Sequence, residues 1–211
     1  MSSILAIDTS TARGGVAVLR DGVVVFEKHF ASERSHHSLL FAPLAEAIEV
    51  GGADLRAIVA GTGPGSYTGA RIGIAAAQGV GLSRKVPVIG LLSVVAPEAA
   101  ALPSEFVVCG DARRGKFFVA RVRDHLLQGE ITLLDADEFR TIRGATAVVP
   151  WFSFDPKTPL GLANICQTSP SAAGLALVAS KIADETIWTL EQRPLEPHYL
   201  AAPFVTQAKM K

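Results

Sequence analysis

The first residues that could do chemistry form a polar turn after a short apolar run near the N-terminus. The run Ile4–Ile7 is followed by a carboxylate and three hydroxyl side chains, those of Asp8, Thr9, Ser10 and Thr11. A tight polar turn offers hydroxyls and backbone N–H groups to anions, so one interpretation is a phosphate or metal–phosphate site, in degenerate form. The turn by itself favours the alternative, an Asx or Ser/Thr turn whose side chains bond only to their own backbone.

A glycine-rich loop is the second candidate. Residues 61–69 contain four glycines, which let a backbone approach a phosphate or another segment closely. The loop lacks the Gly-Lys-Ser/Thr ending of a P-loop and the spacing of a dinucleotide fingerprint. A rigid turn that allows tight packing of two units is therefore the alternative. The residues of this motif are Gly63, Pro64, Gly65, Ser66, Tyr67, Thr68, Gly69 and Arg71.

The rest of the chain offers little catalytic chemistry. It contains no His-Glu-x-x-His motif, no Gly-x-Ser-x-Gly motif and no close Cys/His pair. Asp111, with Arg113 and Arg114, could engage a phosphate or a nucleotide, and a plain surface turn is the alternative. We therefore predict no catalytic residue and no metal site.

Composition excludes several classes of protein. Among 211 residues, 20 Lys and Arg balance 20 Asp and Glu, which argues against a broad nucleic-acid-binding surface. Charged residues make up 19%, below the ~25% of typical soluble domains, and this predicts apolar surface hidden against a partner. The longest apolar stretch, 87–103, is broken at Pro97 and Glu98, so we expect no membrane span. Cys109 and Cys166 are far apart and suit a reducing, cytoplasmic location.

Apolar runs and turn residues predict the elements that position these groups. The first half reads as three antiparallel strands, then helix, strand, helix and strand, over 4–7, 15–19, 23–26, 35–50, 57–60, 70–83 and 86–90. Asp21-Gly22 is a strong hairpin signal between the second and third strands, and Ser35 is the expected N-cap of the first helix. This order predicts an α/β fold with a mixed sheet.

The second half is less regular. Strands over 106–109 and 116–122 around the turn 111–115 suggest that the opening of the first half is repeated. Further expected features are a solvated bend at Asp135 and Asp137, a strand over 147–154, a helix over 171–183 and a Pro-interrupted tail over 193–211.

Two helices in the first half carry weakly polar faces, which predicts a partner interface. On the first helix we expect Leu40, Phe41, Leu44 and Ile48 to face the core, which leaves an almost uncharged outer face. The second helix repeats small residues at every fourth position, a spacing that permits close helix approach; the alternative is packing on its own sheet. The predicted interface residues are Leu39, Ala42, Ala45, Gly73 and Ala77.

Several segments together resemble the TsaB (YeaZ) family. They read ILAIDTST at 4–11, GPGSYTGARIG at 63–73, PVIGLLS at 87–93, DARRG at 111–115 and PHYL at 197–200. The resemblance covers most of the chain, but 124–170 gives no match, and Ala201 stands where the family often has Arg.

The resemblance implies a two-lobed actin/sugar-kinase/Hsp70-like fold, related to ribonuclease H, with lobes over 1–103 and 104–211. It implies a role with a TsaD-type catalytic subunit and a TsaE-type ATPase in forming threonylcarbamoyladenosine at position 37 of tRNAs that read ANN codons. The tRNA is then expected to be reached through the complex, with a homodimer in isolation. Despite the glycoprotease-type (M22) naming of the wider family, we expect no protease.

The resemblance also implies that the chain is not catalytic by itself. Ser93 and Pro97 stand where the catalytic relative carries its metal-binding histidines, and neither can replace an imidazole ligand. No cofactor is expected to be required, although weak or interface-bound ATP or ADP is possible. The alternative function is an active ATP-dependent phosphotransferase of the same superfold, in which Asp8 would organise magnesium and phosphates.

Overall fold

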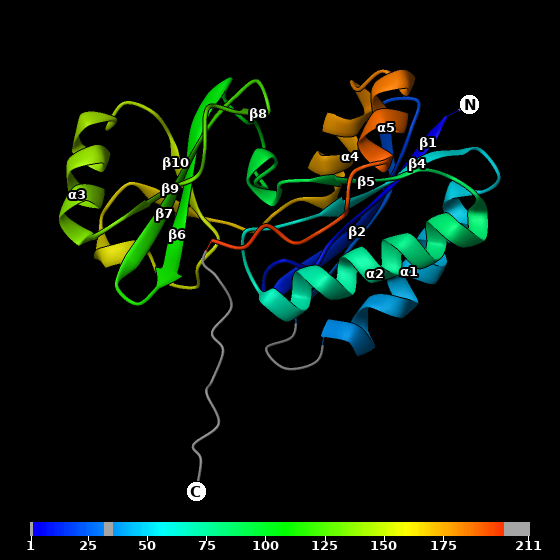
Figure 1. Cartoon of the computed structure of the whole chain (residues 1–211), viewed down its shortest axis with the longest axis horizontal. Helices are drawn as coiled ribbons and strands as arrows, with labels where there is room; N and C mark the ends of the chain where they lie inside the picture. Colours follow the sequence, from blue (N-terminus) through cyan, green and yellow to red (C-terminus); the bar gives the residue numbers. More distant parts are fainter. Residues whose placement is uncertain (1, 32–35, 201–211) are drawn as a thin grey trace, which may run out of the picture.

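The computed structural model of the chain describes residues 2–31 and 36–200, and in it two mixed sheets lie side by side (Figure 1). The predicted N-cap Ser35 and the departure at Ala201 lie outside the described residues, as does the end of the tail. Among the described helices, none has the length and apolar character that a bilayer crossing requires.

The first sheet has the strand order β3-β2-β1-β4-β5. Its elements follow the predicted order, with the bounds β1 (Ser3–Asp8), β2 (Arg13–Arg20), β3 (Val23–Ala31), α1 (His36–Gly51), β4 (Leu55–Gly61), α2 (Tyr67–Arg84) and β5 (Val88–Leu91). β1 is antiparallel to β2 and parallel to β4. Asp21 and Gly22 both have positive φ, as a two-residue hairpin turn requires, so the predicted β2–β3 hairpin is confirmed.

Helices cover both faces of this sheet. Because side chains alternate along a strand, Leu5 and Ile7 face α1 and α2, whereas Ile4 and Ala6 face α4 (Ala172–Ser180) and α5 (Asp184–Glu191). α2 begins three residues before its predicted start, with Ser66 as N-cap accepting a hydrogen bond from the Gly69 N–H.

The second sheet has the order β11-β10-β6-β7-β8, with β9 also paired to β7. Its elements are β6 (Glu105–Arg113), β7 (Lys116–Arg123), β8 (Leu126–Leu127), β9 (Thr132–Leu134), α3 (Ala136–Ala145), β10 (Trp151–Ser153) and β11 (Ile165–Gln167). β6 and β7 are antiparallel, as predicted, and their pairing extends to Arg113 and Lys116. Short 3₁₀ turns, η1 (Ser93–Val95) and η2 (Pro159–Gly161), complete the fold.

The predicted bend at Asp135 and Asp137 is wrong, because α3 begins there. Asp135 is the N-cap: its carboxylate accepts hydrogen bonds from the N–H groups of Asp137 and Glu138, while the Glu138 carboxylate accepts one from the Asp135 N–H. This capping box satisfies three backbone donors of the first turn. Phe139 then anchors the helix on the second sheet against Trp151.

The chain returns to the first sheet at its end. The predicted helix over 171–183 is confirmed as α4, an unpredicted helix, α5, follows it, and both pack on the first sheet. The predicted lobe boundary after residue 103 falls between the strands of the first sheet and those of the second. It does not divide the helices in the same way, because α4 and α5 come after it in the chain but pack on the first sheet. Residues 193–200 then cross the edge of β5, where Leu195 lies against Gly90 and the His198 N–H donates to the Thr62 carbonyl.

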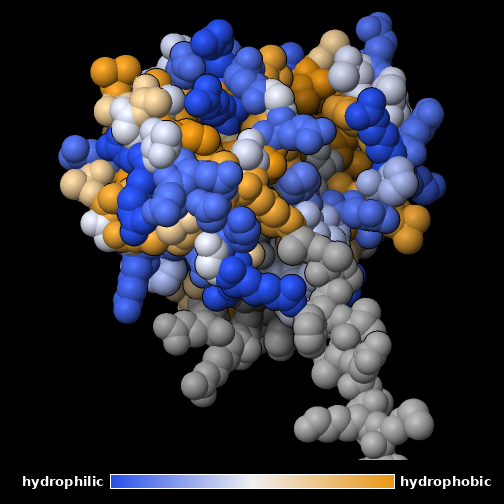
Figure 2. All heavy atoms as spheres, turned by 60° about the vertical axis from the view of Figure 1, so that its left-hand side comes forward, coloured by the Kyte–Doolittle hydropathy of each residue, from blue (hydrophilic) through white to orange (hydrophobic). Residues whose placement is uncertain are grey.

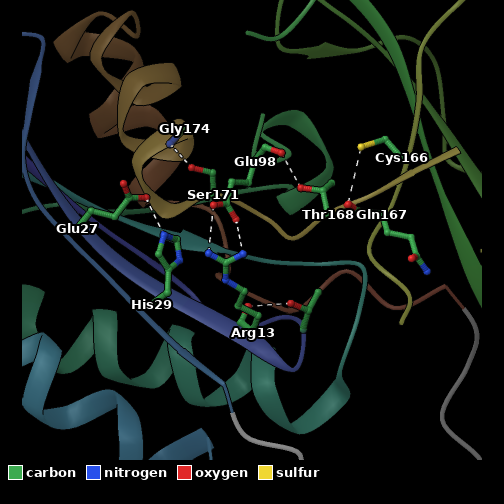
Figure 3. Close-up of polar contacts among 10 residues, drawn as sticks. Arg13, Glu27, His29, Glu98, Cys166, Gln167, Thr168, Ser171 and Gly174 are labelled. Carbon is green, nitrogen blue, oxygen red and sulfur yellow. Dashed lines mark hydrogen bonds and ion pairs between the residues drawn. The ribbon is translucent and has the colours of Figure 1, made fainter. Parts of the chain in front are cut away.

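Two segments cross between the lobes, and they are bonded to one another. Thr168 Oγ1 donates to the Glu98 carbonyl at 2.6 Å, and the Glu98 N–H donates to the Ser169 carbonyl at 2.8 Å. From β2, the Arg13 guanidinium reaches the Glu98 carboxylate at 2.9 Å (Figure 3). The crossings are thus tied to each other and to the first sheet.

Candidate functional site

Asp8 ends β1 as a buried carboxyl group, with 1% of its surface exposed. Its Oδ1 accepts hydrogen bonds from the Ser10 N–H at 2.8 Å and Ser10 Oγ at 2.7 Å, and its Oδ2 accepts one from Ser93 Oγ at 2.6 Å. Burial raises the pKa of Asp8 above its usual value, although these hydrogen bonds lower it. A Cβ on Gly61 would overlap the carboxylate, so no ligand can approach from β4.

Thr9 also points into the protein. Its Oγ1 donates to the Gly69 carbonyl at 2.7 Å, and both its hydroxyl and its carbonyl lie against glycines of α2. The prediction of a phosphate site is therefore wrong for Asp8 and Thr9, and the alternative of a self-bonded turn describes Asp8 correctly. A short apolar run ending in polar residues does not reveal which of these side chains turn inward.

The glycine-rich loop packs on that turn. The Ser66 N–H donates to the Ser10 carbonyl, and a Cβ on Gly65 would overlap the same carbonyl oxygen. A Cβ on Gly69 would overlap the Thr9 carbonyl oxygen. The glycines thus allow the β1–β2 turn and the start of α2 to touch, which agrees with the packing alternative.

A cleft of about 360 Å³ lies between the lobes, beside the contact between the β1–β2 turn and the glycine-rich loop. The predicted residues that line it are Ser10, Thr11, Pro64, Gly65, Ser66 and Asp111. The segments that carry the family resemblance add Ala112, His198, Tyr199 and Leu200. The sequence did not single out the other lining residues, Ala12, Phe118, Phe154, Asp155 and Pro156. Arg113 also lines it.

Two carboxylates hold the second-lobe wall of the cleft. Asp155 Oδ2 accepts a hydrogen bond from the Asp111 N–H at 2.6 Å. Burial raises the Asp155 pKa, this hydrogen bond lowers it, and the negative charge of Asp111 raises it. Among the described residues, no three His, Cys, Asp or Glu side chains gather closely enough to hold a metal ion. The cleft can offer hydroxyls, an acid pair and aromatic walls to a ligand.

The remaining motif residues clamp the C-terminal segment. Arg71 lies 4.0 Å from the Tyr67 ring centroid, and its Nε donates to Tyr199 Oη at 2.7 Å. The rings of Tyr67 and Tyr199 stack at 4.7 Å. Thr68 is exposed beside them. Through Tyr199, this cluster holds the segment 197–200 against α2. It gives Tyr67 and Arg71 of the glycine-rich motif a structural role that the sequence alone did not indicate.

The small-residue stripe of α2 faces its own sheet, so the interface prediction is wrong for Gly73 and Ala77. Ala77 is 0% exposed in the core, and a Cβ on Gly73 would overlap Thr9 Oγ1. Gly81 likewise lies against Val88. The packing alternative holds because four-residue spacing places these positions on one side of the helix, and that side meets β4 and β5.

An apolar groove of about 710 Å³ nevertheless runs between α1 and α2. Phe41, predicted for the core, is 59% exposed and lines it, and of the predicted interface residues Ala45 does too, while Leu39 and Ala42 are exposed on α1. The α2 wall is made by a neighbouring stripe of mostly small and apolar residues, which ends in one charged residue: Ile72, Ala75, Ala76, Gly79, Val80, Ser83 and Arg84.

Comparisons with known proteins agree on the family. A model described as "TsaD: tRNA N6-adenosine threonylcarbamoyltransferase" matches residues 31–142. An uncharacterized protein of Mycobacterium tuberculosis (strain H37Rv) is 31% identical over 96% of this chain and 93% of that protein. The tRNA threonylcarbamoyladenosine biosynthesis protein TsaB of Escherichia coli (strain K12) is 34% identical over 56% of this chain.

The chain belongs to the TsaD family, within it to the TsaB (YeaZ) proteins. The match to TsaB of Escherichia coli spans 53% of that protein. Among solved structures, YeaZ from Pseudomonas aeruginosa aligns with a TM-score of 0.69 at 24% identity, over 95% of this chain and 100% of that one. This likeness confirms the predicted fold, an α/β architecture of the actin/sugar-kinase/Hsp70-like type.

Proposed function

We propose that this chain is a non-catalytic subunit in the biosynthesis of threonylcarbamoyladenosine in tRNA, and that it binds a TsaD-type catalytic subunit. A TsaE-type ATPase would act in the same assembly, and tRNA would be reached through it. Family membership supports the pathway. The exposed apolar groove between α1 and α2 supports the binding role, since monomeric proteins rarely leave such a surface uncovered.

The site chemistry supports a role without catalysis. Asp8 is 1% exposed and bonded to Ser10 and Ser93, so in this arrangement its carboxyl group is not open to a magnesium ion. The Ser93 hydroxyl donates a hydrogen bond to Asp8, and its oxygen accepts one from the Gly63 N–H at 3.0 Å. The competing proposal, an ATP-dependent phosphotransferase, loses its central carboxylate in this arrangement. ATP or ADP would then be a weak ligand at most, and no cofactor would be required.

The groove provides the test of partner binding. Gly79 lies on the groove wall of α2, and a Cβ there would meet no atom within 4 Å. Gly79→Arg should leave the fold intact and place a charge in the interface. An unpaired buried charge costs roughly 3–5 kcal/mol, so affinity for the catalytic subunit should fall at least about a hundredfold. A homodimer through the same groove should dissociate as well.

Gly144→Arg is the matched control. Gly144 is also an exposed helical glycine with nothing within 4 Å of a Cβ, but it lies on α3 of the second lobe. Affinity is measured by calorimetry with the purified catalytic subunit, and threonylcarbamoyl transfer to tRNA by mass spectrometry. Normal binding by Gly79→Arg would contradict the proposed interface. Transfer by this chain alone would contradict the non-catalytic role.

A further inference from the structure

Two large apolar side chains of the first lobe are exposed to solvent outside the α1–α2 groove. Leu82, near the end of α2, is 85% exposed, and Trp188 of α5 is 55% exposed. Both line one hollow of about 580 Å³. Neither belongs to the core, because α2 packs on the sheet through residues such as Ala77, and α5 through Ile187. An exposed tryptophan and leucine in one hollow are typical of a surface that a partner covers.

The hollow lies at the edge of the first sheet, beside β5. α2 and α5 lie on opposite faces of the sheet and flank it from the two sides (Figure 1). Between these helices, the apolar lining consists of Val86, Val88, Pro194 and Leu195. Three separate parts of the first lobe thus contribute apolar surface to one concave site, which suits the side chains of another protein.

The second lobe offers a contrast. Seen from its side, hydrophobic and hydrophilic residues are interspersed on the surface (Figure 2). Val148, for example, is 95% exposed but lines neither this hollow nor the α1–α2 groove. Apolar residues exposed singly are usual on proteins. The position of Leu82 and Trp188 in one hollow is therefore the feature that points to a partner.

The charged residues of the hollow favour a partner that carries a carboxylate. Lys85 and Arg193 line the hollow together with one acidic residue, Glu191. Within the described part of the chain, no ion pair joins Lys85 or Arg193 to a carboxylate. A partner segment with an acidic residue beside its apolar side chains would match this lining.

The hollow adjoins the α1–α2 groove along α2. Ser83 and Arg84 line the groove, whereas their chain neighbours Leu82 and Lys85 line the hollow. Eleven residues line the groove, about half of the roughly 20–30 that a stable interface takes from each partner. A partner seated in the groove must therefore cover further surface, and the hollow continues the apolar surface past the end of α2.

We propose that the catalytic subunit seated on α1 and α2 also places an apolar segment with a carboxylate in this hollow, where Leu82 and Trp188 are its anchors. The proposal rests on the proposed function and extends the interface from the two groove helices to α5. Tryptophan is among the residue types that contribute most to binding when a partner covers them.

The direct test follows the emission of Trp188 when the catalytic subunit binds. The chain contains two tryptophans, and the other, Trp151, is 2% exposed and already shielded. With 5-hydroxytryptophan incorporated into this chain alone, its emission can be excited selectively beside the unlabelled catalytic subunit. Quenching of Trp188 by acrylamide should fall about threefold or more in the complex, because a covered anchor is shielded from solvent. Trp188→Phe should remove the quenchable emission, which assigns the signal.

Affinity for the catalytic subunit, measured by calorimetry, gives a second readout. Trp188→Ala should weaken binding about tenfold or more, and Leu82→Ala about three- to tenfold. Val148→Ala is the matched control, since it truncates an exposed apolar side chain of the second lobe, and it should leave the affinity unchanged. Thermal melting checks that each variant is folded.

A charge reversal tests the predicted carboxylate. Lys85→Glu should weaken binding about three- to tenfold at low salt, and the difference from the original chain should shrink at high salt. Lys157→Glu reverses an exposed lysine of the second lobe and should change neither value. Equal affinities of Lys85→Glu and the original chain at low salt would overturn the acidic character of the segment.

The remaining outcomes separate this contact from the proposed function. Unchanged quenching of Trp188 in a complex that forms normally would overturn the contact and leave the proposed function in place. No complex with the unaltered chain would overturn both. Shielding of Trp188 that rises with the concentration of this chain alone would assign the hollow to a second copy. Shielding by the ATPase subunit alone would assign it to that protein, and either result would overturn the proposal.

Discussion

Asp8 is a carboxyl group removed from water and surrounded by three hydrogen-bond donors. The donors come from two elements, since Ser10 belongs to the β1–β2 turn and Ser93 follows β5. Ser93 Oγ also accepts the Gly63 N–H. Asp8 and Ser93 therefore join three segments: the β1–β2 turn, the residues after β5 and the glycine-rich loop. This is a structural role for the carboxyl group that the alternative function would assign to magnesium.

The buried carboxyl predicts a pH dependence of stability. The Asp8 pKa in the folded chain lies above its ordinary value of 3.8, so between these two values the folded state binds more protons than the unfolded state. The free energy of unfolding should therefore decrease as pH rises through that window. Asp8→Asn carries no charge and should flatten this decrease. Urea denaturation over a pH series from about 4 to about 8 measures both slopes.

Ser93→Ala serves as the second variant in that series. It removes a donor that lowers the Asp8 pKa, so the loss of stability with rising pH should extend to higher pH. Equal slopes for the original chain and Asp8→Asn would mean that Asp8 does not titrate on unfolding in the expected direction.

At the scale of elements, α2 uses its glycines for two opposite purposes. Gly69 lets the helix touch the Thr9 carbonyl, whereas Gly79 faces the open groove. Gly69→Ala should therefore lower the free energy of unfolding by about 1–3 kcal/mol, because backbone must shift. Gly79→Ala, in the same helix, should raise it by about 0.5–1 kcal/mol. Chemical denaturation of both variants gives the comparison, and a stabilised Gly69→Ala would refute the close contact.

The sequence predicts the elements of the first half well, because local signals there are strong. Asp21-Gly22 specifies its hairpin, and short apolar runs bounded by glycines specify β4 and β5. It fails at α3, a short helix in which only Phe139 is fully buried. The Asp135-x-x-Glu138 capping box was present as a signal, but acidic residues at a helix start look like a solvated bend when considered singly.

The candidate site was harder to predict than the elements. Spacing identified the small residues of α2 but not which side of the helix meets the sheet, and a shift of two residues separates Ala77 in the core from Gly79 in the groove. The cleft residues Phe154 and Asp155 come from a strand end 44 residues beyond Asp111. Only tertiary structure brings them together.

At the scale of the whole molecule, the chain leaves the first lobe after β5 and returns with α4 and α5. The first sheet is therefore covered on both faces only when both crossings are in place. Thr168, Glu98 and Arg13 bond these crossings to each other and to β2 (Figure 3). On its covered face α2 is a core helix, while its other side lines the exposed groove between α1 and α2.

That division of α2 leads to opposite outcomes for two nearby substitutions. Ala77→Arg places a charge in the core among Ile7, Ile58 and Ile74. The cost of several kcal/mol is a large part of a stability of about 5–15 kcal/mol, so the chain should unfold or melt far lower. Gly79→Arg should melt near the original temperature and lose its partner. Thermal melting with a pull-down on the catalytic subunit separates these outcomes. A folded Ala77→Arg that fails to bind would instead mean that the original prediction of Ala77 as an interface residue was correct and that α2 presents its other side outward.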